Sequence, residues 1–243
     1  MKRHFISLLT SLFIFTIGLA QAEKKDETIT LALDSFTAKI GKQASPQIID
    51  ARSPEEFAYN HINGALNFNL QTAGYTTFIQ GLDKARPVFI YAINTGRSSA
   101  LAKELKHRGF AEVYDLAGGI ANWIGSGKPY YTSVKKGLSL PEYKNIIASN
   151  QAVLVDIGSR YCAACKKVKP VLDSLRKENG DALKMVEIDL EESPGLIAAL
   201  KTVNVFPYLI LYNQGNIILK KAGAGDIKPE IEAALAKAKI AIR

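Results

Sequence analysis

The chain of 243 residues contains only two cysteines, Cys162 and Cys165, in the spacing C-x-x-C. An apolar run rich in β-branched residues precedes them, and apolar residues then recur at the helical spacing i, i+3, i+4 and i+7: Val168, Val171, Leu172 and Leu175. This pattern places Cys162 where a strand gives way to a helix, and the free N–H groups and positive dipole end there favour a thiolate. We expect Cys162 to be the attacking nucleophile and the first cysteine to be alkylated. Cys165, one turn later, is expected to be more buried and to resolve a mixed disulfide.

Three other uses of this cysteine pair are disfavoured. A zinc site usually needs four ligands, but the chain has no second C-x-x-C and its three histidines are scattered. Covalent haem attachment needs C-x-x-C-H, and the position after the second cysteine is Lys166. A structural disulfide across two residues would constrain the unfolded chain very little. We therefore predict redox exchange without a metal or another cofactor.

Three further features accompany the cysteine pair. Asp156 lies six residues before Cys162 at the end of an apolar strand, where a carboxylate is costly to bury without a role. Pro170 interrupts the helix that follows, and Pro207 opens another apolar strand. This combination resembles the thioredoxin family over roughly residues 138–243, and it implies a thioredoxin fold for that segment.

The resemblance also implies roles for single residues. Phe206 and Pro207 correspond to the cis-proline pair that packs against the active-site sulfurs, and a cis bond is inexpensive only before proline. Asp156 corresponds to the base that deprotonates Cys165 when a mixed disulfide is resolved. Phe206 and Tyr161 are the expected substrate contacts, although Tyr161 stands where thioredoxins usually have tryptophan.

The first 22 residues have the pattern of a secretory signal peptide. A basic start at Lys2 and Arg3 is followed by a mostly apolar run and then by Ala20-Gln21-Ala22, which is typical of a cleavage site. The apolar run is shorter than the roughly 20 residues of a membrane-spanning helix, so no stable anchor is expected. We predict cleavage after Ala22 and export, most simply to a bacterial periplasm. Because that compartment is oxidising and no other cysteine is present, the pair is expected to serve exchange rather than stapling.

The charge of the chain argues against nucleic-acid binding. Loss of Lys2 and Arg3 with the signal peptide lowers the formal net charge from +8 to +6. The remaining excess is spread over many lysines, whereas a nucleic-acid site needs a clustered basic patch. We interpret it as solvated helix surface.

Residues 23–130 alternate between strand and helix patterns. Predicted strands cover Gln47–Asp50, Ala65–Phe68, Pro87–Ile93 and Glu112–Asp115. Predicted helices cover Pro54–Tyr59, Tyr75–Leu82, Arg97–Arg108 and Gly119–Ile124. Such alternation predicts an α/β domain with a doubly wound parallel sheet, in which ligands bind at the carboxyl ends of the strands. The loop 92–97 is therefore the natural candidate site of this domain.

Several segments of this domain together resemble a rhodanese from end to end: residues 49–57, 61–65, 118–123 and 127–129. In that family a loop C-x-x-x-x-R cradles an anion, and its cysteine carries the persulfide. Here Ala92 occupies the cysteine position and Arg97 closes the loop. A methyl group cannot carry sulfane sulfur, so no rhodanese sulfurtransferase activity is expected.

The loop that remains has two interpretations. N–H groups at the start of the following helix, together with the Arg97 side chain, can bind an oxyanion or a partner's carboxylate. The residues concerned are Ala92, Asn94, Thr95, Gly96 and Arg97. Equally, Arg97 can pair with a structural acid and leave the loop without a ligand.

A short linker, residues 131–138, is predicted to join the rhodanese-like domain to a thioredoxin-like domain at 139–243, and we expect the two domains to touch. Ser139 followed by Glu142 three residues later predicts a capped helix start. Asp226 is the candidate cap of a last helix whose apolar face begins at Ile227.

The sequence thus predicts a periplasmic thiol–disulfide oxidoreductase. Ala163 and Ala164 offer no donor that would further stabilise a thiolate, so a reductase or isomerase is favoured over an oxidase. Expected partners are disulfide-bonded or thiol-bearing periplasmic proteins and a membrane thiol–disulfide electron donor. Two alternatives stay open: a binding or adaptor module, and a sulfur-trafficking protein with a persulfide on Cys162. The physiological substrate and the oligomeric state are not predicted.

Overall fold

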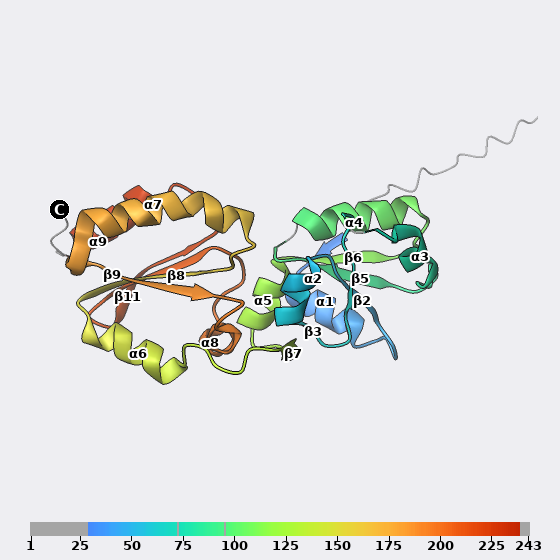
Figure 1. Ribbon diagram of the computed structural model, residues 1–243, viewed down its shortest axis with the longest axis horizontal. Helices are drawn as coiled ribbons and strands as arrows, with labels where there is room; N and C mark the ends of the chain where they lie inside the picture. The colour runs from blue at the N-terminus through green and yellow to red at the C-terminus, as the bar shows by residue number, and fades with distance from the viewer. Residues whose placement is uncertain (1–28, 72, 95, 239–243) are drawn as a thin grey trace, which may run out of the picture.

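The computed structural model describes residues 29–71, 73–94 and 96–238. The predicted signal peptide and Thr95 lie outside these ranges. The described chain forms two α/β domains side by side along the long axis of the molecule (Figure 1). We call residues 29–132 the N-terminal domain and residues 139–238 the C-terminal domain. In the described ranges, no helix has both the length and the apolar character needed to cross a membrane.

The N-terminal domain is built on a parallel sheet of five strands, as the alternating pattern predicted. The order across the sheet is β1-β6-β5-β2-β4. The strands are β1 (Ile29–Leu31), β2 (Gln47–Asp50), β4 (Leu66–Asn67), β5 (Val88–Tyr91) and β6 (Val113–Leu116). The sequence did not predict β1, and β4 and β5 are shorter than expected.

Helices cover both faces of this sheet. They are α1 (Leu33–Ile40), α2 (Pro54–Tyr59), α3 (Tyr75–Gln80), α4 (Gly96–His107) and α5 (Gly119–Gly125). Side chains of α3 and α4, such as Ile79 and Leu101, join one buried cluster with Ile90 of β5. Side chains of α1 and α5 join a second cluster with Phe89, the neighbour of Ile90 in β5. Alternate residues of a strand therefore bury opposite faces of the sheet.

The C-terminal domain has a mixed sheet of four strands in the order β11-β10-β8-β9. The strands are β8 (Ala152–Gly158), β9 (Lys184–Asp189), β10 (Tyr208–Asn213) and β11 (Asn216–Ala222). The helices are α6 (Leu140–Ser149), α7 (Ala163–Asn179), α8 (Pro194–Leu200) and α9 (Ile227–Lys237), with a 3-10 turn at Gly180–Ala182. α7 and α9 cover one face of the sheet, and α6 and α8 cover the other (Figure 1). Strand β9 is parallel to β8, and β10 is antiparallel to it, which is the predicted thioredoxin arrangement.

One of the two predicted helix caps is confirmed. Ser139 and Glu142 form the reciprocal capping box at the start of α6. Asp226 precedes α9 as expected, but its side chain makes no capping hydrogen bond. Ser139 has the extended ψ of 159°, whereas Asp226 has ψ of 85°. Asp226 thus occupies the N-cap position without supplying the side-chain acceptor of a capped helix start.

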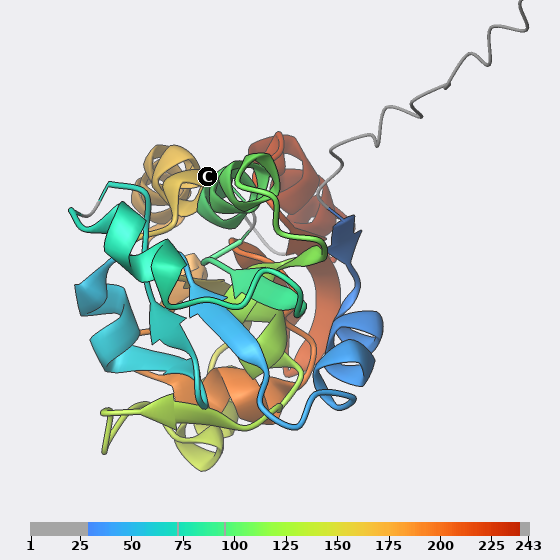
Figure 2. The ribbon, with the colours of Figure 1, turned by 90° about the vertical axis from the view of Figure 1, so that its right-hand side faces the viewer.

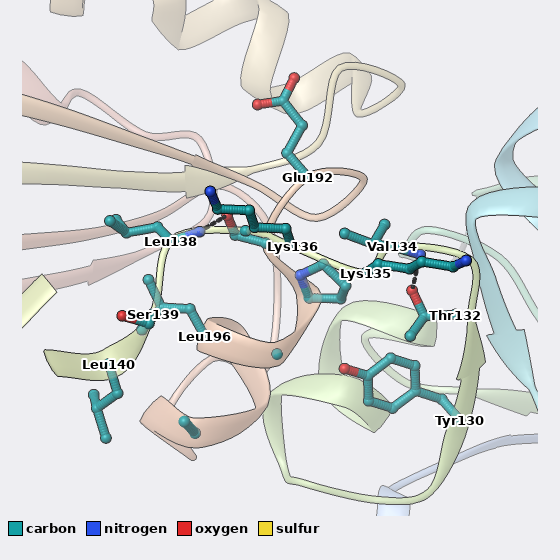
Figure 3. Close-up of a pocket in the computed structure, with 15 residues that line it drawn as sticks. Tyr130, Thr132, Val134, Lys135, Lys136, Leu138, Ser139, Leu140, Glu192 and Leu196 are labelled. Atoms are coloured by element: carbon teal, nitrogen blue, oxygen red, sulfur yellow. Dashed lines mark hydrogen bonds between the residues drawn. The ribbon is translucent and has the colours of Figure 1, made fainter. Parts of the chain in front are cut away.

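The predicted linker, residues 131–138, contacts both domains. Its first residues belong to β7 (Tyr130–Thr132), which pairs with β3 (Asn60–Ile62) of the N-terminal domain. The backbone N–H of Leu138 then donates to Ser193 Oγ at 3.0 Å, just before α8. Between these two points the linker and α8 line an open pocket of about 390 Å³, with Tyr130 and Leu196 on its walls (Figure 3). The linker is thus hydrogen-bonded to the N-terminal domain at one end and to the C-terminal domain at the other.

The two domains share one hydrophobic cluster, so the expected contact between them is confirmed. It includes Ile120 and Trp123 from α5 together with Ile197 from α8 and Phe206. α5 packs against α8 and lies on the side of the N-terminal domain that faces the C-terminal domain (Figure 1). α4 of the N-terminal domain lies on the side of the molecule that also carries α7 and α9 of the C-terminal domain (Figure 2). The redox pair lies in this shared cluster, because Cys162 belongs to it.

Candidate active site

Cys162 and Cys165 form a disulfide at the predicted junction of strand and helix. β8 ends at Gly158, and Cys162 is the N-cap residue of α7. Its sulfur accepts a hydrogen bond from the backbone N–H of Cys165 at 3.1 Å. The α7 start therefore supplies the N–H donor and the dipole that favour negative charge on Cys162.

The predicted order of burial of the two cysteines is wrong. Cys162 is fully buried, with 0% of its surface exposed, whereas Cys165 is partly exposed. The physical reason lies outside the local sequence, because the N-terminal domain contacts the chain on both sides of Cys162. Those contacts involve Arg160 and Phe206.

Asp156 lies on β8 beside the more exposed cysteine. Asp156, Gly158 and Cys165 line one pocket of about 300 Å³. A side chain at Gly158 would meet the Cys165 sulfur, since an added Cβ would lie 3.0 Å from it. Glycine thus makes room for that sulfur at the end of β8.

The carboxyl group of Asp156 is poised to exchange protons. Its Oδ1 atom is buried and has no hydrogen-bond partner. Burial, with a smaller contribution from the nearby Glu187 carboxylate, raises the pKa of Asp156 from its ordinary 3.8 to about 6. A carboxyl with such a pKa accepts or releases a proton close to neutral pH.

Positive charge around the site is largely matched by acids. Arg160 pairs with Asp189 at 3.3 Å and with Glu192 at 2.5 Å. Lys169, on the pocket wall, lies 3.5 Å from Glu187. These partly exposed pairs leave only a modest positive field to favour a thiolate.

A buried acid under the active-site turn is not predicted by the sequence. Glu191 is 2% exposed, and its Oε1 accepts a hydrogen bond from Ser159 Oγ at 2.9 Å. Ser159 Oγ in turn accepts the N–H of Tyr161 at 3.2 Å. Burial raises the pKa of Glu191, whose second oxygen has no partner. Glu191 stands in the acidic run 189–192, which has the composition of a solvated surface loop, so no sequence signal marks it.

Phe206 and Pro207 are joined by a cis peptide bond, as the resemblance implied. Phe206 is 1% exposed and belongs to the same buried cluster as Cys162. Both backbone polar groups of Phe206 bond to Asn94 of the N-terminal domain. The Phe206 N–H donates to Asn94 Oδ1 at 3.3 Å, and Asn94 Nδ2 donates to the Phe206 carbonyl at 3.2 Å.

A second group of contacts reaches the other side of Cys162. The guanidinium of Arg160 lies 6.0 Å from the centre of the Tyr59 ring. The neighbouring Asn60 donates from Nδ2 to the carbonyl of Leu190 at 3.4 Å. Tyr161, the predicted substrate contact, is partly buried. The N-terminal domain therefore meets the active-site loop before Cys162 as well as the cis-proline loop.

The loop that resembles the rhodanese anion cradle is internally paired. Arg97 donates two hydrogen bonds to Glu56, at 2.5 and 2.8 Å, and Glu56 is 1% exposed. Ala92 is also 1% exposed, and its carbonyl accepts the N–H of Ile120 at 2.8 Å. Arg97 therefore pairs with a structural acid, which is the second of its two interpretations. Asn94 bonds to Phe206 of the C-terminal domain, and Gly96 is the first residue of α4. Within the described residues there is no group of three or more His, Cys, Asp and Glu side chains that could hold a metal ion.

Comparisons with known proteins match each half of the chain. A model of the rhodanese-like domain matches residues 33–126, and the thioredoxin model matches residues 135–237. The mitochondrial thioredoxin-3 of Saccharomyces cerevisiae is 34% identical over 94 residues, which cover 39% of this chain and 72% of that protein. The chain belongs to the thioredoxin family. As a member of that family with a disulfide in its C-x-x-C motif, it is a thiol–disulfide oxidoreductase.

Other similarities extend over either part of this thioredoxin-family protein. The uncharacterized protein YqhL of Bacillus subtilis is 31% identical over 128 residues, which cover 53% of this chain and 98% of that protein. The crystal structure of oxidized mitochondrial thioredoxin 3 from Saccharomyces cerevisiae has a TM-score of 0.37 and 27% identity. It covers 43% of this chain and 95% of that one.

Proposed function

We propose that this thioredoxin-family protein is a periplasmic reductase or isomerase of protein disulfides. The observation that supports this best is the placement of the Cys162–Cys165 disulfide at the start of α7, with the Asp156 carboxyl in the same pocket as Cys165. This arrangement supplies a stabilised thiolate, a resolving cysteine and a proton acceptor. These are the groups that two-step thiol–disulfide exchange requires.

In the proposed reaction the Cys162 thiolate attacks a substrate disulfide. One substrate sulfur bonds to Cys162, and the other leaves as a thiolate and takes a proton from solvent. Asp156 then removes the proton of Cys165, whose sulfur attacks Cys162 and releases the second substrate thiol. The substrate gains two electrons, and the Cys162–Cys165 disulfide is restored. Asp156 fits this role because its pKa of about 6 leaves it mostly ionised at neutral pH.

The preference for reduction rests on how few groups stabilise the Cys162 thiolate. In the described part of the chain one N–H group, that of Cys165, donates to the Cys162 sulfur. Ala163 and Ala164 between the cysteines add no donor side chain. A hydrogen bond to a charged group contributes about 1.5–3 kcal/mol, and 30 mV corresponds to about 1.4 kcal/mol for a two-electron couple. A missing bond of this kind makes the couple more reducing by several tens of millivolts.

Location and partners follow from the N-terminal sequence. The pattern of residues 1–22 supports export with cleavage after Ala22. In an oxidising compartment a reductase must be recharged, so a membrane thiol–disulfide donor is the proposed electron source. The substrates are disulfide-bonded proteins of the same compartment.

Two measurements test this function. Equilibration with glutathione buffers gives the reduction potential, and a value in the reducing half of the family range is expected. Insulin reduction should proceed with the full chain and stop in Cys162→Ser. A strongly oxidising potential would make the protein a disulfide donor instead. Insulin reduction that persists in Cys162→Ser would show that the chemistry lies elsewhere.

A further inference from the structure

The contact between Asn94 and Phe206 has the form of a peptide pairing. The amide of Asn94 accepts from the Phe206 N–H and donates to the Phe206 carbonyl. A primary amide carries the same donor and acceptor as a peptide unit, and an extended polypeptide adds to a chain edge through this reciprocal pair of bonds. Asn94 thus occupies the position at which a polypeptide would pair with the chain beside the cysteines.

The N-terminal domain is fitted closely to this position. A Cβ added to Gly125 of α5 would collide with the carbonyl oxygen of Val203, three residues before Phe206. The backbone conformation of Gly125 does not itself require glycine, because its φ lies outside the left-handed region. Glycine is needed there so that α5 can approach the other domain. Asn60 makes a second contact between the domains, and Cys162, which belongs to the cluster that both domains share, has 0% of its surface exposed.

The other sulfur of the pair is reached by a different route. The lining of the pocket of about 300 Å³ includes Cys165 and Asp156 but not Cys162. A pocket of this size admits a small molecule but not a folded polypeptide. Its wall carries Arg160, Lys166 and Lys169 alongside Asp156, Glu187 and Asp189, so the pocket selects by size rather than by charge.

We propose that the N-terminal domain sorts the reactants of the disulfide by size: small thiols attack Cys165 through this pocket, whereas a polypeptide must first displace Asn94 from Phe206. The proposal rests on the redox function proposed above and adds the class of reactant. It gives the domain a role that needs no cysteine at Ala92.

The small-thiol step balances without another reactant. A small thiolate bonds to the sulfur of Cys165, the Cys162–Cys165 bond breaks, and Cys162 leaves as a thiolate that accepts the N–H of Cys165. A second small thiol then attacks the mixed disulfide and releases Cys165, which takes up a proton. Two small thiols are oxidised to one disulfide, the protein disulfide is reduced to a thiol and a thiolate, and one proton passes to solvent.

The test compares two reductants of the oxidised full chain: 2-mercaptoethanol and a reduced thioredoxin as a protein thiol. Gly125→Ala adds a methyl group that separates the domains. Gly195→Ala is the matched control, because it adds the same group on α8, where no atom lies within 4 Å. Loss of contacts worth two hydrogen bonds should speed reduction by the protein thiol about tenfold in Gly125→Ala. Reduction by 2-mercaptoethanol should change by less than about twofold, and Gly195→Ala should match the wild type with both.

Acid quenching and a second variant test the same proposal. Acid quenching during reduction by 2-mercaptoethanol should show the first adduct on Cys165, and an adduct on Cys162 would overturn the proposal. Equal acceleration of both reductants, or of neither, would also overturn it. If Gly125→Ala does not fold, Asn94→Ala removes the two hydrogen bonds without adding volume and should give the same selectivity. No reduction by either thiol in any variant would instead overturn the proposed redox function itself.

Discussion

Asp156 on β8 and Glu187 on β9 are register partners in a parallel pair, so two carboxyl groups stand on the same face of the sheet. Burial and this neighbour raise the pKa of Asp156 from 3.8 to about 6. Ionising Asp156 therefore costs free energy in the folded state. The penalty is absent below about pH 4, grows between pH 4 and 6, and is complete above pH 6.

Replacing Asp156 should stabilise the protein fully above about pH 6 and not at all below about pH 4. We expect Asp156→Asn to raise the free energy of unfolding of the oxidised protein at pH 7.5 by up to about 3 kcal/mol. The gain should vanish at pH 3.5. Urea unfolding at both pH values measures it, with Asp226→Asn as the control at an exposed carboxylate. An equal gain at both pH values would contradict ionisation as the cause.

Burial also predicts the order in which the reduced cysteines react. Iodoacetamide should modify Cys165 before Cys162, because a small reagent does not displace the residues that bury Cys162. Mass spectrometry of the two peptides over time measures the order. Cys165→Ser should then react more slowly than Cys162→Ser. Faster modification of Cys162 would mean that the domains separate on reduction.

The sequence predicted the features that depend on neighbouring residues. The turn from β8 to α7 at Cys162 follows from an apolar run, a cysteine pair and a helical repeat. The Ser139 capping box follows from two residues three apart. The predicted α2 has the observed bounds Pro54–Tyr59. Each of these is specified within one or two turns of chain.

What the sequence did not predict depends on residues far apart. Asn94 and Phe206 are 112 positions apart, and no periodicity in either segment indicates that they pair. The reversed burial of the two cysteines follows from that contact. Glu56, the partner of Arg97, is 41 positions away and is also part of a helix cap. The three residues of β1 are too few to show a strand period.

The shared cluster predicts that the two domains unfold together. Trp123 is the single tryptophan of the chain and lies in α5 at the contact between the domains. Its fluorescence and the far-UV circular dichroism of the whole chain should therefore change at the same urea concentration. Gly125→Ala should separate the two transitions. Separate transitions in the wild type would show that the domains are thermodynamically independent.

The closed loop predicts that restoring a cysteine will not restore a rhodanese. Ala92→Cys should show no thiosulfate:cyanide turnover above the wild type, which is itself expected to be inactive. The position is 1% exposed, and the arginine of the loop is bound to Glu56. A colorimetric thiocyanate assay measures this. Turnover in Ala92→Cys would mean that the loop opens far enough to admit an anion.

The position of α5 bears on how this chain can be divided. The family matches end at residue 126 and resume at residue 135, which suggests a convenient place to cut. A fragment that begins there would expose Ile197, Val203 and Phe206, which are buried beside α5 in the whole chain. Contiguous apolar surface of this kind promotes self-association in water. A soluble fragment of the C-terminal half therefore needs polar replacements on the α8 face. In the intact chain, α5 covers that face.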